Sequence, residues 1–278
     1  MSTIVLAHGL FGFGDKLPGF SSIFSLHYFN GVKAHLEARG HSVFAFQVNP
    51  VGSIVERGNQ LADSIRDCKE LVDTIHIIAH SMGGLDARHA ITNRPEVGAR
   101  VATLVTIGTP HKGSPVADAI VDPSNKLRAQ IPDFLLRQVD PKAGAILDLT
   151  TQRCSDFDAR TKNVKSVRYI EIAGDASEAH KSLLFDLAAE IGKIHGINDG
   201  VVAKTSALHE QGTEHLPDWP TDHGGEIGWS FDSPVPIVER SPLLPHLELP
   251  LLPAASAHLQ RYDAIVALLK GKPATAGA

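Results

Sequence analysis

The chain has 278 residues, of which 43% are apolar and 21% charged, and its formal net charge at pH 7 is −5. A chain of this length can bury one sizeable core, so we predict a single α/β domain over residues 1–278, interrupted by insertions. The acidic balance argues against nucleic acid or an anionic membrane surface as a partner. Only Cys68 and Cys154 occur, which excludes a disulfide framework, and we expect two reduced thiols.

Strands and helices alternate along the first 107 residues. Apolar runs predict strands over residues 4–7, 43–48, 74–78 and 101–107. Helical spacing predicts helices over residues 29–39, 54–72 and 85–93. Strands that alternate with helices need crossover connections, so we expect a mainly parallel sheet with helices on both faces.

The third predicted strand runs directly into Ala79-His80-Ser81-Met82-Gly83-Gly84, and a helix follows at once. A strand-to-helix turn of this kind holds one side chain above the sheet edge on strained backbone, and it needs small neighbours. The usual pattern is G-x-S-x-G, and Ala79 at the first position is small enough to fit. We therefore predict that Ser81 is a nucleophile.

The alternation of strands and helices breaks after Pro110. Residues 114–163 contain amphipathic segments without a strand, and the sheet resumes at residues 167–173. Because this insertion lies between two strands, on the side where the nucleophile emerges, we predict a helical lid. A second insertion, residues 229–253, is rich in proline and leucine, which excludes regular helix or a central strand. A last helix is predicted over residues 254–270.

A serine hydroxyl is a weak nucleophile at neutral pH, so it needs a base within hydrogen-bond reach and a carboxylate that orients this base. In α/β hydrolases both residues follow the serine, the acid first and the histidine second. We predict Asp199 as the acid, because its Asn-Asp-Gly turn lies between apolar stretches. The alternative is Asp175, which directly follows the strand that ends at residue 173.

Five histidines follow the predicted acid, namely His209, His215, His223, His246 and His258. His223 lies in a loop whose glycines suit a catalytic side chain held on irregular backbone, so we predict it as the base. His215 is the alternative. His246 falls in the proline-rich insertion, and His258 falls in the last helix, where we expect it to pack or to lie on the surface.

The negative charge that develops on a carbonyl oxygen needs backbone N–H donors that already point at it. We predict two donors, Met82 at the start of the nucleophile helix and Leu10 in the glycine-rich loop after the first strand. The glycines of this loop are not followed by a helix start, which excludes a dinucleotide fingerprint. No P-loop, H-E-x-x-H or C-x-x-C pattern occurs, so we expect no cofactor.

Five segments together resemble the bacterial triacylglycerol lipases of family I, pseudomonad type, which have a minimal α/β-hydrolase core. These segments are residues 5–13, 80–88, 106–114, 198–202 and 222–223. The resemblance implies an α/β-hydrolase fold with Ser81, Asp199 and His223 as the triad, and Leu10 and Met82 as the oxyanion donors. The activity that it implies is the hydrolysis of carboxylic esters of acyl lipids.

The chain departs from this family in two places. Family members bind a structural calcium ion partly through an aspartate two positions after the catalytic histidine, where this chain has Gly225. Glu226 is the alternative ligand, but we expect the calcium site to be lost and predict no bound metal. The insertion at residues 229–253 has no counterpart in the family, and we expect it to cover the acyl cleft or to form an apolar docking surface.

The sequence therefore predicts a serine carboxylic-ester hydrolase, a lipase or esterase that cleaves fatty-acyl esters through an acyl-enzyme intermediate. The alternative is an acyltransferase or thioesterase that uses the same Ser-His-Asp triad. The expected partner is a small acyl ester or lipid, taken from a lipid–water interface, and not a nucleic acid. Because residues 1–8 lead straight into a strand, we expect a cytoplasmic protein, or one exported without a cleavable N-terminal signal peptide.

Overall fold

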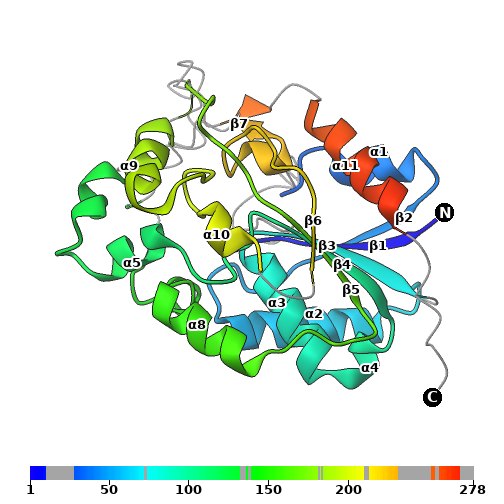
Figure 1. Cartoon of the computed structure of the whole chain (residues 1–278). Helices are drawn as coiled ribbons and strands as arrows, with labels where there is room; N and C mark the ends of the chain where they lie inside the picture. Colours follow the sequence, from blue (N-terminus) through cyan, green and yellow to red (C-terminus); the bar gives the residue numbers. More distant parts are fainter. Residues whose placement is uncertain are drawn as a thin grey trace, which may run out of the picture.

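Six parallel strands form the central sheet of the computed structural model, in the order β2-β1-β3-β4-β5-β6 (Figure 1). They are β1 (Thr3–Ala7), β2 (Ser42–Phe46), β3 (Ile75–His80), β4 (Val101–Ile107), β5 (Arg168–Ile172) and β6 (Glu214–His215). The structure describes residues 1–10, 28–71, 74–131, 136, 139–180, 182, 184–209, 213–230, 252–253 and 257–269. Each neighbouring pair of strands in this sheet is parallel, as the alternation of strands and helices predicts.

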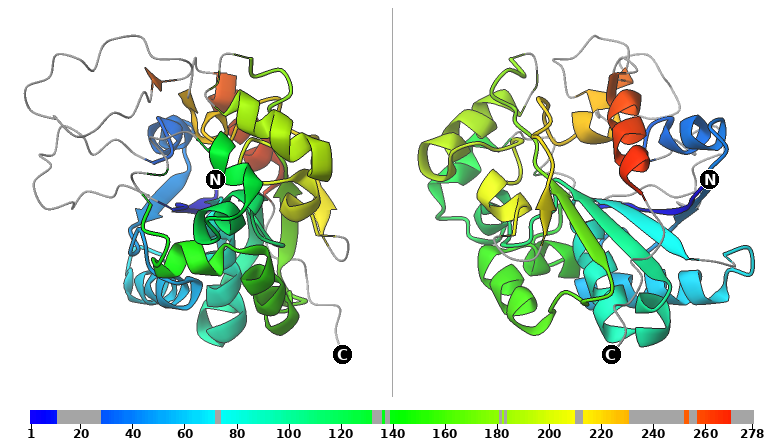
Figure 2. Two further views of the ribbon diagram at one scale, coloured as in Figure 1. Left: turned by 90° about the vertical axis from the view of Figure 1, so that its left-hand side faces the viewer. Right: turned by 45° about the vertical axis from the view of Figure 1, so that its right-hand side comes forward.

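Helices cover both faces of the sheet (Figures 1 and 2). One face carries α2 (Ile54–Asp67), α3 (Met82–Asn93) and α4 (Pro95–Gly98), and the other carries α1 (Val32–Glu37) and α11 (Ala257–Leu268). Side chains of one strand alternate between the two cores, since Val5 packs toward α2 and α3 whereas Leu6 packs toward α1 and α11. The predicted architecture, a parallel sheet with helices on both faces, is confirmed.

The predicted elements differ from the observed ones mainly at their ends. The helix predicted over residues 54–72 ends at Asp67, because Cys68 adopts extended backbone with ψ 107°. Its beginning is fixed by Ser53, whose side-chain oxygen accepts a hydrogen bond from the Glu56 N–H at 3.2 Å. The nucleophile helix begins at Met82, directly after Ser81, so it starts three residues earlier than predicted. Both cysteines are free thiols.

The insertion at residues 114–163 is helical in its described part. It contains α5 (Pro115–Val121), the 3-10 helix η2 (Lys126–Gln130), α7 (Gly144–Asp148) and α8 (Thr151–Arg160). Apolar side chains of α5 and α7 pack against Leu184 and against Leu187 and Ile191 of α9 (Phe185–His195). This packing places the insertion beside the sheet end where the strands finish (Figure 1). That the insertion acts as a lid stays a prediction.

The chain enters and leaves its proline-rich insertion at neighbouring points. Residues Trp229–Ser230 form β7 and Leu252–Pro253 form β8, and these two short strands pair antiparallel. Residues 231–251, with His246 among them, lie outside the described part of the chain, so the predicted role of this insertion is untested. No helix among the described residues has both the length and the apolar character needed to cross a bilayer.

The close approach of α3 to β1 generates a prediction about stability. A methyl group at Gly83 would collide with the Ala7 carbonyl and lie 2.8 Å from the His8 carbonyl oxygen, and neither backbone atom can give way easily. Gly83→Ala should therefore destabilise the protein by about 1–3 kcal/mol. The matched control is Gly192→Ala in α9, where the nearest atom would lie at 3.6 Å and helix propensity favours alanine. Thermal unfolding should show a lower midpoint for the first variant only, and equal midpoints would contradict this packing.

Candidate active site

Ser81 lies on a strained turn between the last residue of β3 and the first residue of α3. Its φ is 55°, and it is the one residue other than glycine with a positive φ in the described chain. A backbone conformation of this kind costs on the order of 1–3 kcal/mol and persists only where the surroundings enforce it. Here Ser81 N–H donates to the Ile107 carbonyl, and the Ser81 carbonyl accepts from the Thr109 hydroxyl, both at 2.9 Å.

Three side chains that are far apart in the sequence form one hydrogen-bonded line at this turn. His223 Nε2 lies 3.0 Å from Ser81 Oγ, and His223 Nδ1 lies 2.8 Å from Asp199 Oδ2. The fully buried Asp199 accepts backbone N–H bonds from Val201 and Val202 on its other oxygen, at 2.8 and 2.7 Å. The structure thus brings together all three residues predicted as the triad.

The alternative residues considered from the sequence lie elsewhere. Asp175 accepts a hydrogen bond from the Ser177 N–H, and the described contacts include none between Asp175 and His223. His215 contacts the His209 carbonyl oxygen at 2.7 Å, in a separate group of side chains. Of the two positions expected for His258, packed or on the surface, the structure shows the packed one, since this residue is buried and its Nε2 lies 2.7 Å from the Asn30 carbonyl oxygen.

The backbone of the first loop is pressed against the nucleophile. A Cβ atom at Gly9 would lie 2.7 Å from Ser81 Cβ, so this loop passes directly beside the Ser81 side chain. The buried Arg57 holds the loop by donating to the His8 and Gly9 carbonyls at 2.8 and 3.2 Å, and its Nε donates to Asp86 at 2.8 Å. Leu10 follows immediately, and its N–H is a candidate oxyanion donor on this held backbone.

Met82 supplies the second candidate donor. It is the first residue of α3, and the first N–H groups of a helix have no acceptor within the helix itself. His8 braces the loop on the other side, because its Nε2 accepts a hydrogen bond from the Val48 N–H at 3.2 Å. Burial, assisted by the charge of Arg57, lowers the pKa of His8 to about 4, so this ring is neutral at pH 7.

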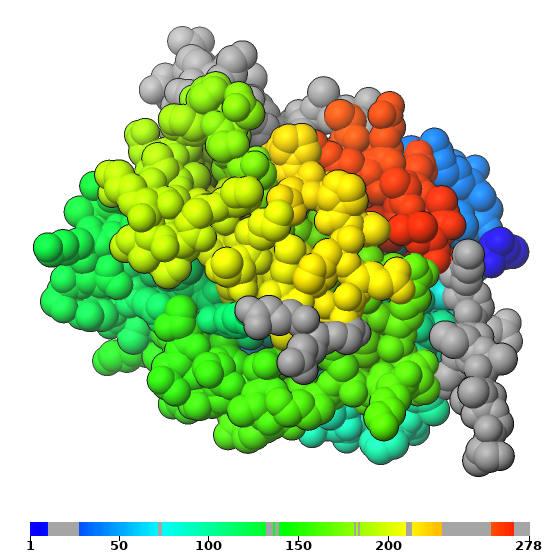
Figure 3. All heavy atoms as spheres, in the orientation of Figure 1, coloured from blue at the N-terminus to red at the C-terminus, as the bar shows by residue number. Residues whose placement is uncertain are grey.

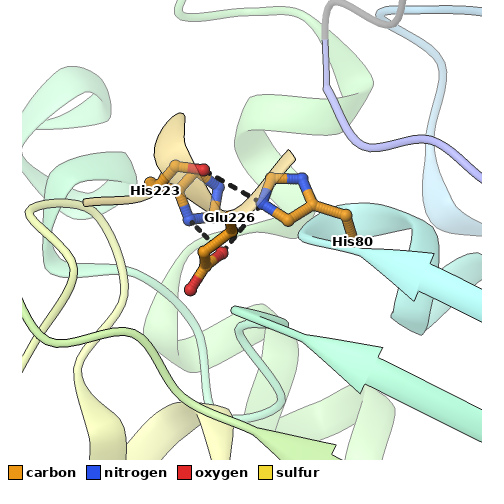
Figure 4. Close-up of side chains that lie close together, drawn as sticks. All are labelled: His80, His223 and Glu226. Atoms are coloured by element: carbon orange, nitrogen blue, oxygen red, sulfur yellow. Dashed lines mark hydrogen bonds and ion pairs between the residues drawn. The ribbon is translucent and has the colours of Figure 1, made fainter. Parts of the chain in front are cut away.

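Glu226 is a second carboxylate beside His223 (Figure 4). Its side chain is fully buried, with Oε2 2.8 Å from His80 Nε2 and 3.5 Å from His223 Nδ1. Burial, and then the charges of Asp199 and Asp222, raise the pKa of Glu226 well above its ordinary value. From the sequence we considered Glu226 only as a replacement calcium ligand, whereas the structure turns its carboxylate toward the two histidines.

Two glycines make room for this carboxylate. A Cβ atom at Gly108 or at Gly174 would collide with a Glu226 carboxylate oxygen. The position of the family's calcium-binding aspartate is different, because a Cβ atom at Gly225 would collide with the Thr221 hydroxyl. The residues present therefore do not fit a calcium ligand at position 225, and no catalytic step is derived through calcium.

His80 connects Glu226 to the loop side of the site. Its Nδ1 lies 2.7 Å from the Tyr28 hydroxyl, and its Nε2 is 2.8 Å from Glu226 and 3.1 Å from the His223 carbonyl oxygen. Burial, and then the proximity of His223, lower the pKa of His80 well below its ordinary value. The neutral ring accepts from Tyr28 and donates toward Glu226.

His209 belongs to a different buried cluster, which ties the insertion to the sheet. Its Nδ1 lies 2.6 Å from Glu171 of β5, and its Nε2 lies 2.9 Å from Asp158 of α8. Burial opposes a charge on this ring, but hydrogen bonds to Asp158 and Glu171 outweigh burial and raise the pKa of His209. Arg88 of α3 donates to the same Asp158 at 2.7 Å, so the cluster joins three elements.

A parallel sheet with a serine on a strand-to-helix turn, hydrogen-bonded to an imidazole and through it to a carboxylate, defines an α/β hydrolase. The model of the PGAP1-like alpha/beta domain family matches residues 2–181, and the chain belongs to this family.

Curated relatives agree with the resemblance seen in the sequence. The chain is 36% identical to a triacylglycerol lipase of Vibrio cholerae over 132 residues, which cover 46% of this chain and 39% of that protein. It is 35% identical to triacylglycerol lipase 2 of Saccharomyces cerevisiae over 116 residues, which cover 40% of this chain and 36% of that protein. The chain thus spans less than half the length of the curated relatives that it matches.

Solved structures confirm the predicted α/β-hydrolase fold. A Staphylococcus hyicus lipase superposes with a TM-score of 0.67 at 17% identity, covering 96% of this chain and 94% of that chain. The mature Bacillus licheniformis lipase BlEst2 also gives a TM-score of 0.67, at 24% identity, covering 81% of this chain and 86% of that chain.

The His209 cluster predicts a pH-dependent contribution to stability. The contribution from its ring charge is fully present below about pH 6.5, the ordinary pKa of an unfolded histidine, and is lost as pH rises through the raised folded pKa. We expect the unfolding free energy of the wild type to exceed that of His209→Gln by an amount that shrinks above pH 6.5. Denaturant unfolding between pH 6 and 9 measures this difference, with the exposed His180→Gln as control. A difference that stays constant over this range would contradict a charged ring.

Proposed function

We propose that the protein is a serine carboxylic-ester hydrolase that cleaves fatty-acyl esters through an acyl-enzyme intermediate. The observation that carries this proposal is the unbroken line from Ser81 through His223 to Asp199, with the serine on strained backbone. The printed names of the curated relatives, triacylglycerol lipases, support the same activity.

In the first half-reaction, Ser81 Oγ attacks the ester carbonyl carbon while its proton passes to His223 Nε2. The resulting imidazolium keeps its Nδ1–H on Asp199, which holds the ring in orientation and stabilises its charge. The negative charge on the carbonyl oxygen is held by the N–H groups of Leu10 and Met82. The tetrahedral intermediate then collapses, and the alcohol leaves with the proton from His223.

In the second half-reaction, water attacks the acyl-enzyme. His223 accepts a proton from this water, and the oxyanion again forms beside the same two N–H groups. Breakdown of the second tetrahedral intermediate returns the His223 proton to Ser81 Oγ and releases the fatty acid. Ser81 is 7% exposed, so substrate reaches it along a restricted path.

The surroundings of the oxyanion loop favour an apolar acyl group. The Leu10 side chain packs against two apolar clusters, one around Met82 and Leu85 and one formed by the insertion and α9. An acyl chain placed beside Leu10 would therefore contact hydrocarbon side chains, which favours fatty-acyl esters over acetates by about 0.8 kcal/mol for each buried CH₂ group. A lipid–water interface is the expected source of such a substrate.

Removal of the nucleophile tests the proposed reaction. Ser81→Ala should lower turnover by about 10⁴-fold or more. The variant should still fold, because alanine differs from serine only by the hydroxyl. A fluorophosphonate probe, which reacts with activated serines, should label the wild type and leave the variant unlabelled. Labelling of both proteins to the same extent would contradict the assignment of Ser81.

A series of p-nitrophenyl esters from acetate to palmitate tests the substrate class. We expect kcat/KM to rise with acyl length before it levels off, because each added CH₂ group is buried beside the apolar clusters. A profile that is highest for acetate would contradict a fatty-acyl substrate. Added alcohol and thiol acceptors test the alternative activities in the same assay, since an acyltransferase would transfer the acyl group to them in preference to water.

A further inference from the structure

Two groups of histidine and carboxylate side chains in the described part of the chain have the composition of a metal site. One group is His80, His223 and Glu226, and the other is His111, Glu171 and His209. In each group, three potential ligand atoms lie within 4.8 Å of one another. Charge balance and hydrogen bonding separate the two groups.

The group around His209 already has its charges balanced by protons and by arginine. Its imidazole lies between two carboxylates and holds a proton on each nitrogen, as the distances of 2.6 and 2.9 Å require. Arg88 Nη1 lies 3.3 Å from His111 Nδ1, so a divalent ion would have a guanidinium as neighbour. A metal ion there would replace one proton and add uncompensated positive charge to a buried site.

In the described part of the chain, the group at the triad instead lacks a lysine or arginine that would neutralise its acidic side chains. The carboxylates of Glu226, Asp199 and Asp222 are all buried, and none forms an ion pair with lysine or arginine among the described residues. The charge of Arg261 reaches Glu226 but does not pair with it, because this guanidinium stacks over the Trp219 ring at 5.4 Å. Buried carboxylates without a cation favour the entry of positive charge.

The distances in this group also suit a tetrahedral ion. Ligand atoms about 2.0–2.1 Å from Zn²⁺ are separated from one another by about 3.3 Å. Glu226 Oε2 lies 2.8 Å from His80 Nε2 and 3.5 Å from His223 Nδ1 (Figure 4). Asp199 Oδ2 lies 2.8 Å from His223 Nδ1 but outside this set of mutually close ligand atoms, so the fourth position of the tetrahedron is left to water. The second carboxylate oxygen of Glu226 is buried without a hydrogen-bond partner, so it is free to turn toward an ion.

We propose that His80, His223 and Glu226 form an inhibitory site for a divalent transition-metal cation such as Zn²⁺. This inference rests on the proposed function, because it takes His223 as the catalytic base. Two imidazoles and one carboxylate suit Zn²⁺ and its neighbours in the first transition row, whereas Ca²⁺ and Mg²⁺ prefer oxygen ligands alone. The site thus differs in selectivity from a structural calcium site.

Inhibition follows from where the protons must go. A metal ion on His223 Nδ1 takes the lone pair of that nitrogen, so the single ring proton moves to Nε2. Nε2 then has no lone pair with which to accept the Ser81 proton, and the attack on the ester stops. On His80 the proton moves from Nε2 to Nδ1, where the Tyr28 hydroxyl oxygen, at 2.7 Å, accepts it. Any proton on Glu226 is released to solvent.

Burial predicts slow onset. The His223 side chain is 14% exposed, whereas those of His80 and Glu226 are 1% and 0% exposed. A metal ion must therefore approach along the His223 ring and displace it for a moment before the other ligands are reached. We expect inhibition by Zn²⁺ to develop over a preincubation and to be reversed by a chelator.

The inhibition assay compares Zn²⁺ with Ca²⁺ and Mg²⁺ on the full chain, with each variant normalised to its own metal-free rate. Zn²⁺ should inhibit, and Ca²⁺ and Mg²⁺ should not. Substitution of a residue that only hydrogen-bonds to a metal ligand weakens metal binding by about 10–100-fold. Glu226→Gln removes a ligand itself, so it should raise the inhibitory Zn²⁺ concentration by at least this factor. The matched control His180→Asn removes an exposed histidine beside Glu178 and should leave the inhibitory concentration unchanged.

A second measurement does not depend on activity. Co²⁺ added to Ser81→Ala should bind in a one-to-one ratio and show the visible absorption of a tetrahedral site, and the added Glu226→Gln change should abolish this absorption. Absorption that survives Glu226→Gln, or that is lost in His209→Gln instead, would overturn the proposal. So would the absence of Co²⁺ binding at millimolar concentrations. If the protein does not hydrolyse esters, the substrate assay will show it. The Co²⁺ measurement still tests the metal site in that case, because it reads absorption and not turnover.

Discussion

The backbone conformation at Ser81 is the constraint on which the site depends. Parallel pairing aligns the carboxyl ends of β1, β3 and β4, with Ala7 opposite Ala79 and His80 opposite Ile107. This register places the Ile107 carbonyl where it accepts the Ser81 N–H, and it brings α3 so close to β1 that only glycine fits at position 83. The strained turn is therefore held by the sheet, which offsets its local cost.

Three acidic side chains gather at the edge of the sheet that carries Ser81. Two carboxylates, those of Asp199 and Glu226, lie within 3.5 Å of the same imidazole nitrogen, and a third, that of Asp222, lies one residue before His223. Under the proposed function, the charge of Asp199 stabilises the imidazolium that forms during attack. Under the proposed metal site, the neighbouring acidic side chain of Glu226 binds a cation, so the two proposals draw on one cluster of acidic side chains.

A second buried network positions the insertion. Asp158 in α8 accepts a hydrogen bond from Arg88 of α3 and also contacts His209. His209 in turn contacts Glu171 of β5. Described residues between α9 and β7, coloured yellow, occupy the middle of one face, between α8 and α11 (Figure 3). His209 of this network and His223 of the predicted triad are separated by only 14 positions in the sequence, so the two groups of side chains belong to one part of the chain.

The sequence by itself determined the features that short-range patterns encode. Strand–helix alternation predicted the parallel sheet, and the turn around Ser81 predicted the nucleophile, because each of these signals is local. The choice of Asp199 and His223 combined their local turn and loop patterns with the order that the triad has in α/β hydrolases. The role of Glu226 was decided only by the tertiary structure: its partner His80 is 146 residues away, and the space for its carboxylate comes from Gly108 and Gly174. Contacts of that separation depend on how the sheet and its loops pack together, which no local pattern records.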